Sequence, residues 1–252
     1  MKHFTIRQFM EASGGTWYGP SEALEQDIQG VTIDSRLVQE GFLFIAVPGA
    51  QVDGHRFIPD VYAKGALGAV SQQKLSSPAG PYLLVEDTLQ ALKDGAEAYR
   101  KTLTIPLIGI TGSAGKTSTK EMIASVLSQK YQVLKTMGNF NNEIGVPLTI
   151  FRIDDCHEAA VLEMGMNHFG EMHRLSKIVR PTHCVFTNIG VAHLEHLGSR
   201  DGILKAKTEM LDYAAEDAVL VSNGDDDKLG ILKDRAVTFG CSPSSQVWAE
   251  HI

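Results

Sequence analysis

The first hundred residues contain short runs of apolar side chains separated by glycine, proline and serine. Four of these runs predict strands, at residues 30–34, 42–47, 67–71 and 82–85. Over residues 88–103 the apolar positions recur at intervals of three and four, with charged residues between them, which predicts an amphipathic helix. Pro106 then opens a new apolar run. We therefore expect a small α/β domain over residues 1–105.

After residue 105 the pattern becomes an alternation of apolar strands and amphipathic helices. Strands are expected at residues 106–111, 132–136, 159–163, 183–187 and 218–222, and helices at 116–129, 170–178 and 200–214. This alternation is typical of a mostly parallel sheet with helices on both faces. The last residues, VTFGCSPSSQVWAEHI, show no closing element. The expected fold class is therefore α/β, with a second domain over residues 106–252 that is incomplete at its C-terminus.

Composition and charge narrow the class of protein. A hydrophobic fraction of 43% and a charged fraction of 21% are usual for a globular chain. The formal charge of −7 leaves no general positive field, so neither nucleic acid nor a membrane surface is expected as a partner. The N-terminus lacks the apolar segment of a signal peptide. The three cysteines are far apart and have no CxxC spacing, which indicates a reducing compartment and a cytoplasmic location.

The segment GITGSAGKTSTKEM, residues 109–122, joins a predicted strand to a predicted helix. In that context the N–H groups of a glycine-rich turn and of the helix N-terminus converge on a phosphate. Lys116 is expected to reach the β- and γ-phosphates of a nucleotide, and the Thr117 hydroxyl to bind Mg²⁺. Ile110 stands where the usual pattern has its first glycine, so Gly112 is expected to supply the flexibility. The candidate nucleotide-binding residues are Gly112, Ser113, Ala114, Gly115, Lys116, Thr117 and Ser118.

Two further side chains follow predicted strands of the same sheet. Glu163 ends the run AAVLE, where a phosphate-loop protein carries its Mg²⁺-associated acid, and His193 lies just beyond the strand at 183–187. Ligands of open parallel sheets collect beyond the carboxyl ends of the strands, so we expect both to share one crevice with Lys116. Each has a structural alternative, because Glu163 could cap the following helix and His193 could hydrogen-bond within its loop.

Residue spacing disfavours several other kinds of chemistry. The pairs His168/His173 and His193/His196 lack the HExxH pattern and a companion cysteine, so we expect structural histidines rather than zinc ligands. No Asn-Lys-x-Asp segment follows the phosphate loop, which disfavours a GTPase. The acidic run at residues 225–227 is expected to be a solvated turn.

Several segments resemble the ATP-dependent Mur ligases of peptidoglycan synthesis and occur in that family's order. They are TGSAGKTSTKEM at 111–122, GNFNNEIGVPLT at 138–149, EMGMNHFGEM at 163–172, TNIGVAHLEHLGS at 187–199 and AKTEML at 206–211. TIDSR at 32–36 and GAQVDGHRF at 49–57 resemble the family's uridine-sugar-binding domain. Folylpolyglutamate synthetases share the central fold, but their phosphate loop lies much nearer the N-terminus. The resemblance extends over essentially all 252 residues.

The resemblance implies an enzyme that uses ATP and Mg²⁺ to phosphorylate a substrate carboxylate, after which an amine attacks the acyl phosphate. Within the family the similarity is greatest to the branch that joins D-alanyl-D-alanine to UDP-N-acetylmuramoyl-tripeptide. The family's roles, carried to this chain, make Lys116, His193 and Lys207 catalytic. They give Mg²⁺ four ligands: Thr117, Glu163, His193 and Lys207, the last after carbamylation by CO₂. Without the resemblance, Lys207 is an ordinary helix-surface lysine.

The same resemblance implies residues that bind the sugar nucleotide. Asp34, Ser35 and Arg36 are expected to contact the uracil or the pyrophosphate, and Asp53, Gly54 and His55 to line the same pocket. Asn139, Asn141 and Asn142 are expected to approach the muramoyl-peptide end. Taken alone, all three segments favour polar turns.

Several alternatives stay open at this point. The family's third, C-terminal domain is not visible, so we expect the chain to bind its substrates but to turn over poorly. Separately, the expected oligomeric state is a monomer. The chain could instead be another Mur ligase, a P-loop small-molecule kinase or a non-catalytic UDP-sugar-binding module. The third residue of the tripeptide, diaminopimelate or lysine, is not determined by any feature of the sequence.

Overall fold

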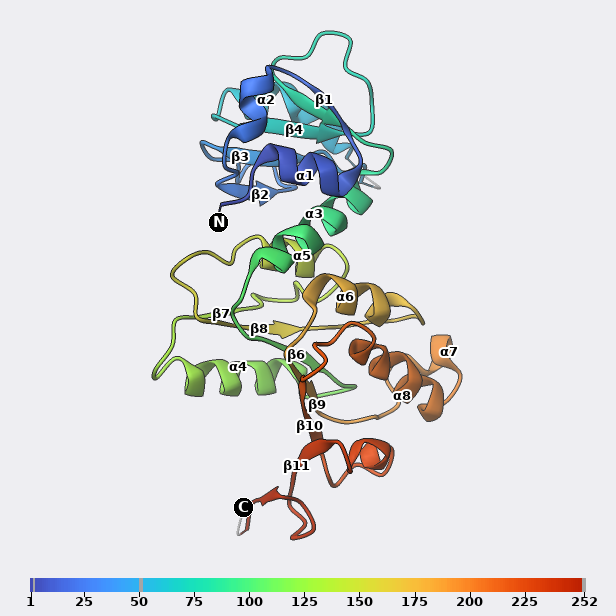
Figure 1. Cartoon of the computed structure of the whole chain (residues 1–252). Helices are drawn as coiled ribbons and strands as arrows, with labels where there is room; N and C mark the ends of the chain where they lie inside the picture. The colour runs from blue at the N-terminus through green and yellow to red at the C-terminus, as the bar shows by residue number, and fades with distance from the viewer. Residues whose placement is uncertain (2, 50–51, 251–252) are drawn as a thin grey trace. The chain divides into compact units, whose positions relative to one another are not determined.

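The computed structural model describes residues 1, 3–49 and 52–250, which fold into two compact units (Figure 1). The first unit comprises Met1–Leu103 and Ile150–Asp155, and the second comprises Thr104–Thr149 and Cys156–Ile252. The boundary expected near residue 105 did not anticipate the return of Ile150–Asp155 to the first unit. Phe151 explains this return, because its buried ring stacks on Tyr99 at a centroid distance of 5.8 Å.

The first unit contains a five-stranded sheet in the order β1-β5-β4-β3-β2. The strands are β1 (Thr16–Tyr18), β2 (Gly30–Thr32), β3 (Phe42–Ile45), β4 (Gly68–Ser71) and β5 (Tyr82–Leu84). All neighbouring pairs are parallel except β1 and β5. The four predicted strands are confirmed, whereas β1 was missed because its residues, Thr-Trp-Tyr, form no run of aliphatic side chains and its two outer residues are exposed.

The helices of the first unit are α1 (Ile6–Ser13), α2 (Ile58–Tyr62) and α3 (Thr88–Thr102), with single turns η1 (Ser21–Glu25) and η2 (Gly54–Phe57). The predicted amphipathic helix is α3, and the Asp87 side chain caps it by accepting from Leu89 N and Gln90 N. Helix α1 was not predicted, although Thr5 and Gln8 form a capping box at its start. Helices α1 and α3 pack against each other.

Gly95→Ala is expected to destabilise the first unit by about 2 kcal/mol, although alanine usually stabilises a helix interior. A Cβ at Gly95 of α3 would lie 2.3 Å from Cε2 of Phe9, whose ring in α1 is fully buried. Urea denaturation measures the effect. Gly230→Ala is the control, because no heavy atom lies within 4 Å of a Cβ there. Equal stability of the two variants would contradict this account of the packing.

The second unit contains a seven-stranded parallel sheet in the order β12-β11-β10-β9-β6-β8-β7. The strands are β6 (Leu107–Thr111), β7 (Val133–Lys135), β8 (Ala159–Glu163), β9 (His183–Phe186), β10 (Val219–Asn223), β11 (Ala236–Gly240) and β12 (Val247–Trp248). The five predicted strands and the parallel sheet are confirmed. Strands β11 and β12 lie in the segment where no closing element was expected. The fold class is α/β, as the sequence predicted.

The helices of this unit are α4 (Lys116–Leu127), α5 (Gly145–Ile150), α6 (Glu171–Val179), α7 (Leu194–Leu197) and α8 (Arg200–Thr208), with turns η3 (Glu209–Leu211) and η4 (Leu229–Leu232). The helix predicted at 200–214 is therefore shorter and continues as η3. Ile108 and Ile110 of β6 pack with Ala124 of α4, whereas Gly109 between them faces Met210 of η3. Strand β6 thus has helical cover on both faces, with α4 on one side and η3 on the other.

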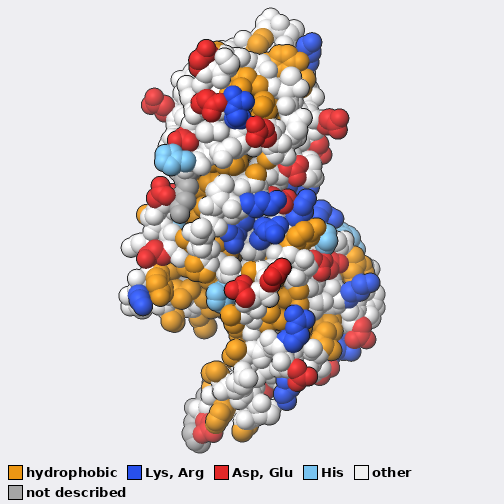
Figure 2. Space-filling model, in the orientation of Figure 1, with side chains coloured by type: hydrophobic (Ala, Val, Ile, Leu, Met, Phe, Trp, Pro, Cys, Tyr) orange, Lys and Arg blue, Asp and Glu red, His pale blue; other side chains and the backbone are white. Residues whose placement is uncertain are grey.

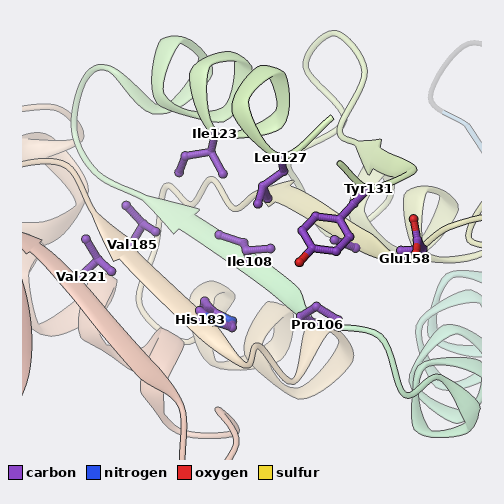
Figure 3. A pocket seen from close by; sticks show the side chains of 10 residues that line it. Pro106, Ile108, Ile123, Leu127, Tyr131, Glu158, His183, Val185 and Val221 are labelled. Carbon is purple, nitrogen blue, oxygen red and sulfur yellow. The ribbon is translucent and has the colours of Figure 1, made fainter. Parts of the chain in front are cut away.

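An apolar cavity of about 530 Å³ lies between α4 and the neighbouring sheet face. In Figure 3, Ile123 and Leu127 project from α4 toward Ile108 of β6. Met122 and Val126 on the same helix are exposed, and Figure 2 shows hydrophobic side chains gathered over α4. Pro106 and His183 place the cavity near the amino ends of the strands. It is therefore separate from the phosphate loop and has the wrong polarity for an anion.

None of the described helices combines the length and the apolar character that crossing a membrane requires.

Candidate functional site

The phosphate loop connects β6 to α4 at the carboxyl edge of the sheet. Gly115 is the N-cap of α4 and adopts a left-handed conformation with φ 78°, and no side chain caps this helix. The first N–H groups of a helix have no partner within it, so those of Lys116, Thr117 and Ser118 are available to an anion. Gly112 is required for a steric reason, because a Cβ there would lie 1.8 Å from Thr187 Oγ1. Gly112 also has a φ of 157°, which L side chains rarely adopt, so the position uses both the conformational freedom expected of glycine and its small size.

Two lysines converge on one backbone carbonyl of this loop. Lys116 Nζ donates to Gly112 O at 2.9 Å, and Lys207 Nζ of α8 donates to the same oxygen at 3.0 Å. Lys207 is only 1% exposed, so its interpretation as an ordinary surface lysine is wrong. Burial, followed by the charge of Lys116, lowers the pKa of Lys207 to about 7. The loop therefore holds the amine of Lys116 and a second amine, that of Lys207, which is only about half protonated at neutral pH, where the phosphates of a nucleotide would add negative charge.

His193 lies within the electrostatic reach of both lysines. Burial lowers its pKa, and the charges of Lys207 and Lys116 lower it further. His193 adopts a left-handed conformation with φ 65° at the start of α7, which is uncommon for a residue other than glycine. The neutral imidazole favoured by this environment is the form that binds metal ions.

A buried acid lies beside the first turn of α4. Glu163 ends β8 and is 3% exposed, and its Oε2 accepts from Thr117 Oγ1 at 2.9 Å. Its Oε1 accepts from Asn141 Nδ2 at 2.8 Å, and its backbone N–H donates to Thr136 Oγ1. Within the described part of the chain, no Lys or Arg forms an ion pair with Glu163. A buried carboxylate paired only with neutral donors next to a hydroxyl offers the hard oxygen ligands that Mg²⁺ requires.

The asparagines after β7 have different surroundings. Asn141 orients Glu163, whereas Asn142 Oδ1 accepts from Ile144 N and Gly145 N at the start of α5. Asn139 contributes its carbonyl to Asn141 N. The structure therefore places Asn141 in the acidic part of the site and gives Asn142 a capping position.

The candidate sugar-nucleotide residues make local contacts within the first unit. Arg36 forms a forked pair with Asp34, and these hydrogen bonds lower the pKa of Asp34 to about 2. Asp53 Oδ1 accepts from His55 N and contacts His55 Nδ1 at 2.6 Å. Gly54 is tightly packed, because a Cβ there would lie 2.7 Å from Val47 O.

Of the remaining residues in these two segments, the Ser35 carbonyl accepts from Lys64 Nζ. Ala50 and Gln51 of the segment GAQVDGHRF lie outside the described residues.

The histidines that the sequence analysis considered as zinc ligands and rejected do not contact one another in the pairs that their spacing suggested. The His168 ring packs against the His196 ring in a tilted arrangement, at a centroid distance of 4.4 Å, and His168 also contacts Glu171, whereas His173 contacts Asp212. Among the described residues, the one cluster with three potential metal ligands is Asp154, Cys156 and His157. All three belong to the segment DDCH at residues 154–157, where they are exposed or half-exposed. This segment is distant in sequence from the phosphate loop.

The acidic run at residues 225–227 is a largely exposed turn, as expected, and its side chains also make specific contacts. Asp226 Oδ2 accepts from Ile189 N at 2.8 Å, and Asp227 forms a forked ion pair with Arg200. Asp225 accepts from Cys241 N and Ser242 N. The run therefore ties the end of β10 to the loop after β9. Spacing along the sequence carries no signal for such contacts.

Sequence reasoning also missed three residues at the site. Thr187, the last residue of the strand predicted at 183–187, and Asn188, which follows it, both form hydrogen bonds with the phosphate loop. Lys120 is 2% exposed, and its Nζ donates to Thr136 O at 2.9 Å. The sequence did offer a signal for each: Thr187 and Asn188 lie at the carboxyl end of a predicted strand, and Lys120 lies within the segment KTSTKEM.

Family comparisons agree with this geometry. The model of the Mur ligase middle domain matches residues 110–252, and that of the Mur ligase family catalytic domain matches residues 27–133. The chain belongs to the Mur ligase family. A Mur ligase of Bacillus subtilis, UDP-N-acetylmuramoyl-tripeptide–D-alanyl-D-alanine ligase, is 42% identical over 225 residues, which cover 88% of this chain and 49% of that protein. The chain spans about half the length of the curated relatives it matches.

Solved structures of Mur ligases show the same fold. MurF from Acinetobacter baumannii superposes with a TM-score of 0.88 at 33% identity, covering 100% of this chain and 56% of that one. MurF ligase from Thermotoga maritima, solved in complex with ADP, has a TM-score of 0.77 at 35% identity and covers 85% of this chain and 51% of that one.

The stability of this Mur ligase chain is expected to rise between pH 7 and about pH 10 because of Lys207. Its pKa falls from 10.5 to about 7 on folding, so the unfolded chain binds more protons over that range. The slope from this group is at most about 1.4 kcal/mol per pH unit. Urea denaturation in CO₂-free buffer at pH 7 and 9.5 measures it. Lys207→Met should flatten the dependence, and parallel profiles for the two proteins would contradict the assignment.

Proposed function

We propose that this protein acts in the ATP-dependent joining of D-alanyl-D-alanine to UDP-N-acetylmuramoyl-tripeptide. One observation carries the proposal: Lys116 and Lys207 converge on the phosphate loop, beside the buried Glu163 and the Thr117 hydroxyl that donates to it. The substrates in this proposal are those in the name of the ligase of Bacillus subtilis, to which the chain is 42% identical. The proposal includes a monomeric state and a cytoplasmic location, as the sequence analysis expected.

The reaction consists of two transfers. A carboxylate oxygen of the tripeptide attacks the γ-phosphorus of ATP, so the new P–O bond forms as the bond to ADP breaks. The amine of D-alanyl-D-alanine then attacks the acyl carbon, the phosphate leaves, and the amine loses a proton to give the amide. A carboxylate at neutral pH is a poor electrophile, which is why phosphorylation must come first. Neither transfer needs a covalent nucleophile from the protein.

The residues of the phosphate loop would bind and orient the nucleotide. The free amides at the start of α4 would donate hydrogen bonds to its phosphate oxygens, and Lys116 would turn from Gly112 O to the transferring phosphoryl group. Thr117 and Glu163 fit Mg²⁺, and His193 fits a second ion through a neutral nitrogen. Bound Mg²⁺ would supply neutralisation of the developing phosphate charge.

Lys207 is proposed to become a carbamate. At neutral pH about half of a group with a pKa of about 7 is the uncharged amine, which is the form that attacks CO₂. The neutral amine forms an N–C bond as one C=O π bond of CO₂ opens, and the nitrogen then releases one proton. The uncharged amine thereby becomes an anionic carbamate suited to Mg²⁺. The sugar nucleotide is assigned to the first unit, through Asp34, Ser35, Arg36, Asp53, Gly54 and His55, with Asn139, Asn141 and Asn142 proposed near the peptide end.

Calorimetric titration of this chain tests the proposal. We expect ADP to bind more tightly with Mg²⁺ than without it, and UDP-N-acetylmuramoyl-tripeptide to bind more tightly than UDP. Titrations with diaminopimelate and lysine tripeptides identify the third residue. Gln90→Ala, on the exposed face of α3, is the control. Failure to bind either nucleotide, or a phosphorylated product formed from ATP and the sugar nucleotide that is stable to the amine, would contradict the proposal.

A further inference from the structure

The phosphate loop is held by a second loop that follows β9, here called the β9 loop and comprising residues 187–190. Thr187 Oγ1 donates to Ala114 O at 2.6 Å. Asn188 Oδ1 accepts from Ser113 N at 3.1 Å and from Ala114 N at 2.9 Å, and Asn188 O also accepts from Ser113 N at 3.0 Å. Gly190 N donates to Ser113 Oγ at 2.9 Å. Both polar backbone groups of Ala114 are therefore satisfied by one short segment.

The β9 loop is itself fixed from β10 and α8. Asn223 Nδ2 donates to Thr187 O at 3.1 Å, and Asp226 Oδ2 accepts from Ile189 N. Arg200 donates from Nε and from its terminal nitrogen to Ile189 O, at 2.9 and 2.8 Å. Thr187 and Ile189 are buried. The β9 loop is thus supported at both of these positions before any ligand binds.

We propose that Thr187 and Asn188 are positioning residues that hold the phosphate loop in its anion-binding conformation. The inference rests on the proposed function and extends it to residues that the nucleotide does not need to touch. Ser113 and Ala114 turn their amides toward Asn188, while the amides at the start of α4 have no helical partner and stay available.

The physical basis is pre-organisation. A loop with glycines at positions 112 and 115 has many conformations, and ordering it on binding would reduce the affinity for a ligand. Contacts from a buried neighbouring segment order the loop in the free protein. The close approach of Gly112 to Thr187 belongs to the same contact between the two loops, because only a glycine leaves room for the Thr187 side chain there.

Three variants test the proposal. Thr187→Ala removes the hydroxyl that donates to Ala114 O, Thr187→Ser retains it, and Asn188→Ala removes the side-chain acceptor of two amides. A pair of hydrogen bonds of ordinary strength corresponds to about a tenfold change in affinity or more. We expect Thr187→Ala, which loses one hydrogen bond, to weaken ADP binding by roughly fivefold, and Asn188→Ala, which loses two, to weaken it by roughly tenfold. Both effects should be equal with and without Mg²⁺, and Thr187→Ser should bind ADP like the unmodified chain.

Amide hydrogen exchange in the free protein provides a readout that needs no nucleotide. Asn188→Ala should accelerate exchange at Ser113 and Ala114, while amides of the first unit keep their rates. Gln90→Ala is the matched control, because it removes an amide side chain that bonds to Asp94 in the first unit. A purely structural role would lower the melting temperature and leave ADP affinity and local exchange unchanged.

The outcomes separate this inference from the proposed function. If the unmodified chain binds no ADP, the proposed function fails at its nucleotide step, whereas the exchange rates still test the inference. If the unmodified chain binds ADP and both alanine variants bind it within twofold, the inference is wrong. The same conclusion follows if exchange at Ser113 and Ala114 is unchanged in Asn188→Ala, or if Thr187→Ser binds no better than Thr187→Ala.

Discussion

Replacing Gly112 with alanine is expected to weaken ADP binding by at least about a hundredfold and to destabilise the second unit by about 2–3 kcal/mol. The added Cβ would lie 1.8 Å from Thr187 Oγ1, 3.1 Å from Thr187 Cβ and 3.2 Å from Asn188 N. The phosphate loop and the β9 loop must then separate, and the Gly112 carbonyl that accepts from Lys116 and Lys207 must move with them. Calorimetry with ADP and urea denaturation measure the two effects.

A second substitution distinguishes this clash from a general effect of alanine. Thr187→Ala removes the oxygen that the new Cβ would meet, so the double variant should regain part of the stability lost by Gly112→Ala. Gly230→Ala, where a Cβ meets open space, should change neither quantity. A double variant as unstable as the sum of its single variants would show that the Thr187 contact is not the cause.

Replacing Glu163 with glutamine is expected to abolish the strengthening of nucleotide binding by Mg²⁺. Ligase turnover in the protein that carries the proposed activity should fall by at least about a hundredfold. Glutamine keeps the shape but removes the charge, and it offers one acceptor oxygen where Thr117 and Asn141 now meet two. Calorimetric titration of ADP with and without Mg²⁺ measures the first effect, and phosphate release measures the second.

The control for charge is Glu121→Gln, on α4. Glu121 is exposed and pairs with Lys120 and Lys135, so the loss of its charge should leave the Mg²⁺ dependence intact. Binding without Mg²⁺ should be similar in both variants and in the unmodified chain. An undiminished Mg²⁺ effect in Glu163→Gln would remove Glu163 from the metal site.

The sequence predicted the parts of the site that lie within one strand–turn–helix segment. Lys116 and Thr117 follow β6 at the expected positions, and Glu163 ends β8 as the run AAVLE indicated. The position of Glu163 relative to Thr117 followed from a general property of parallel sheets, whose carboxyl ends share one edge. Lys207 entered only through the resemblance, because a lysine between Ala206 and Thr208 on a helix carries no sign of burial.

The sequence by itself determined the α/β class, the two-part organisation and the phosphate loop, because periodicities of two and 3.6 residues and turn chemistry are local properties. Only the tertiary structure decided which distant groups meet that loop. Placing β9 beside β6 brings Asn188 to Ser113 across 75 positions, and α8 carries Lys207 to Gly112 across 95. The burial that lowers the pKa of Lys207 arises from that packing. Strand order and burial depend on the whole chain, and no local pattern encodes them.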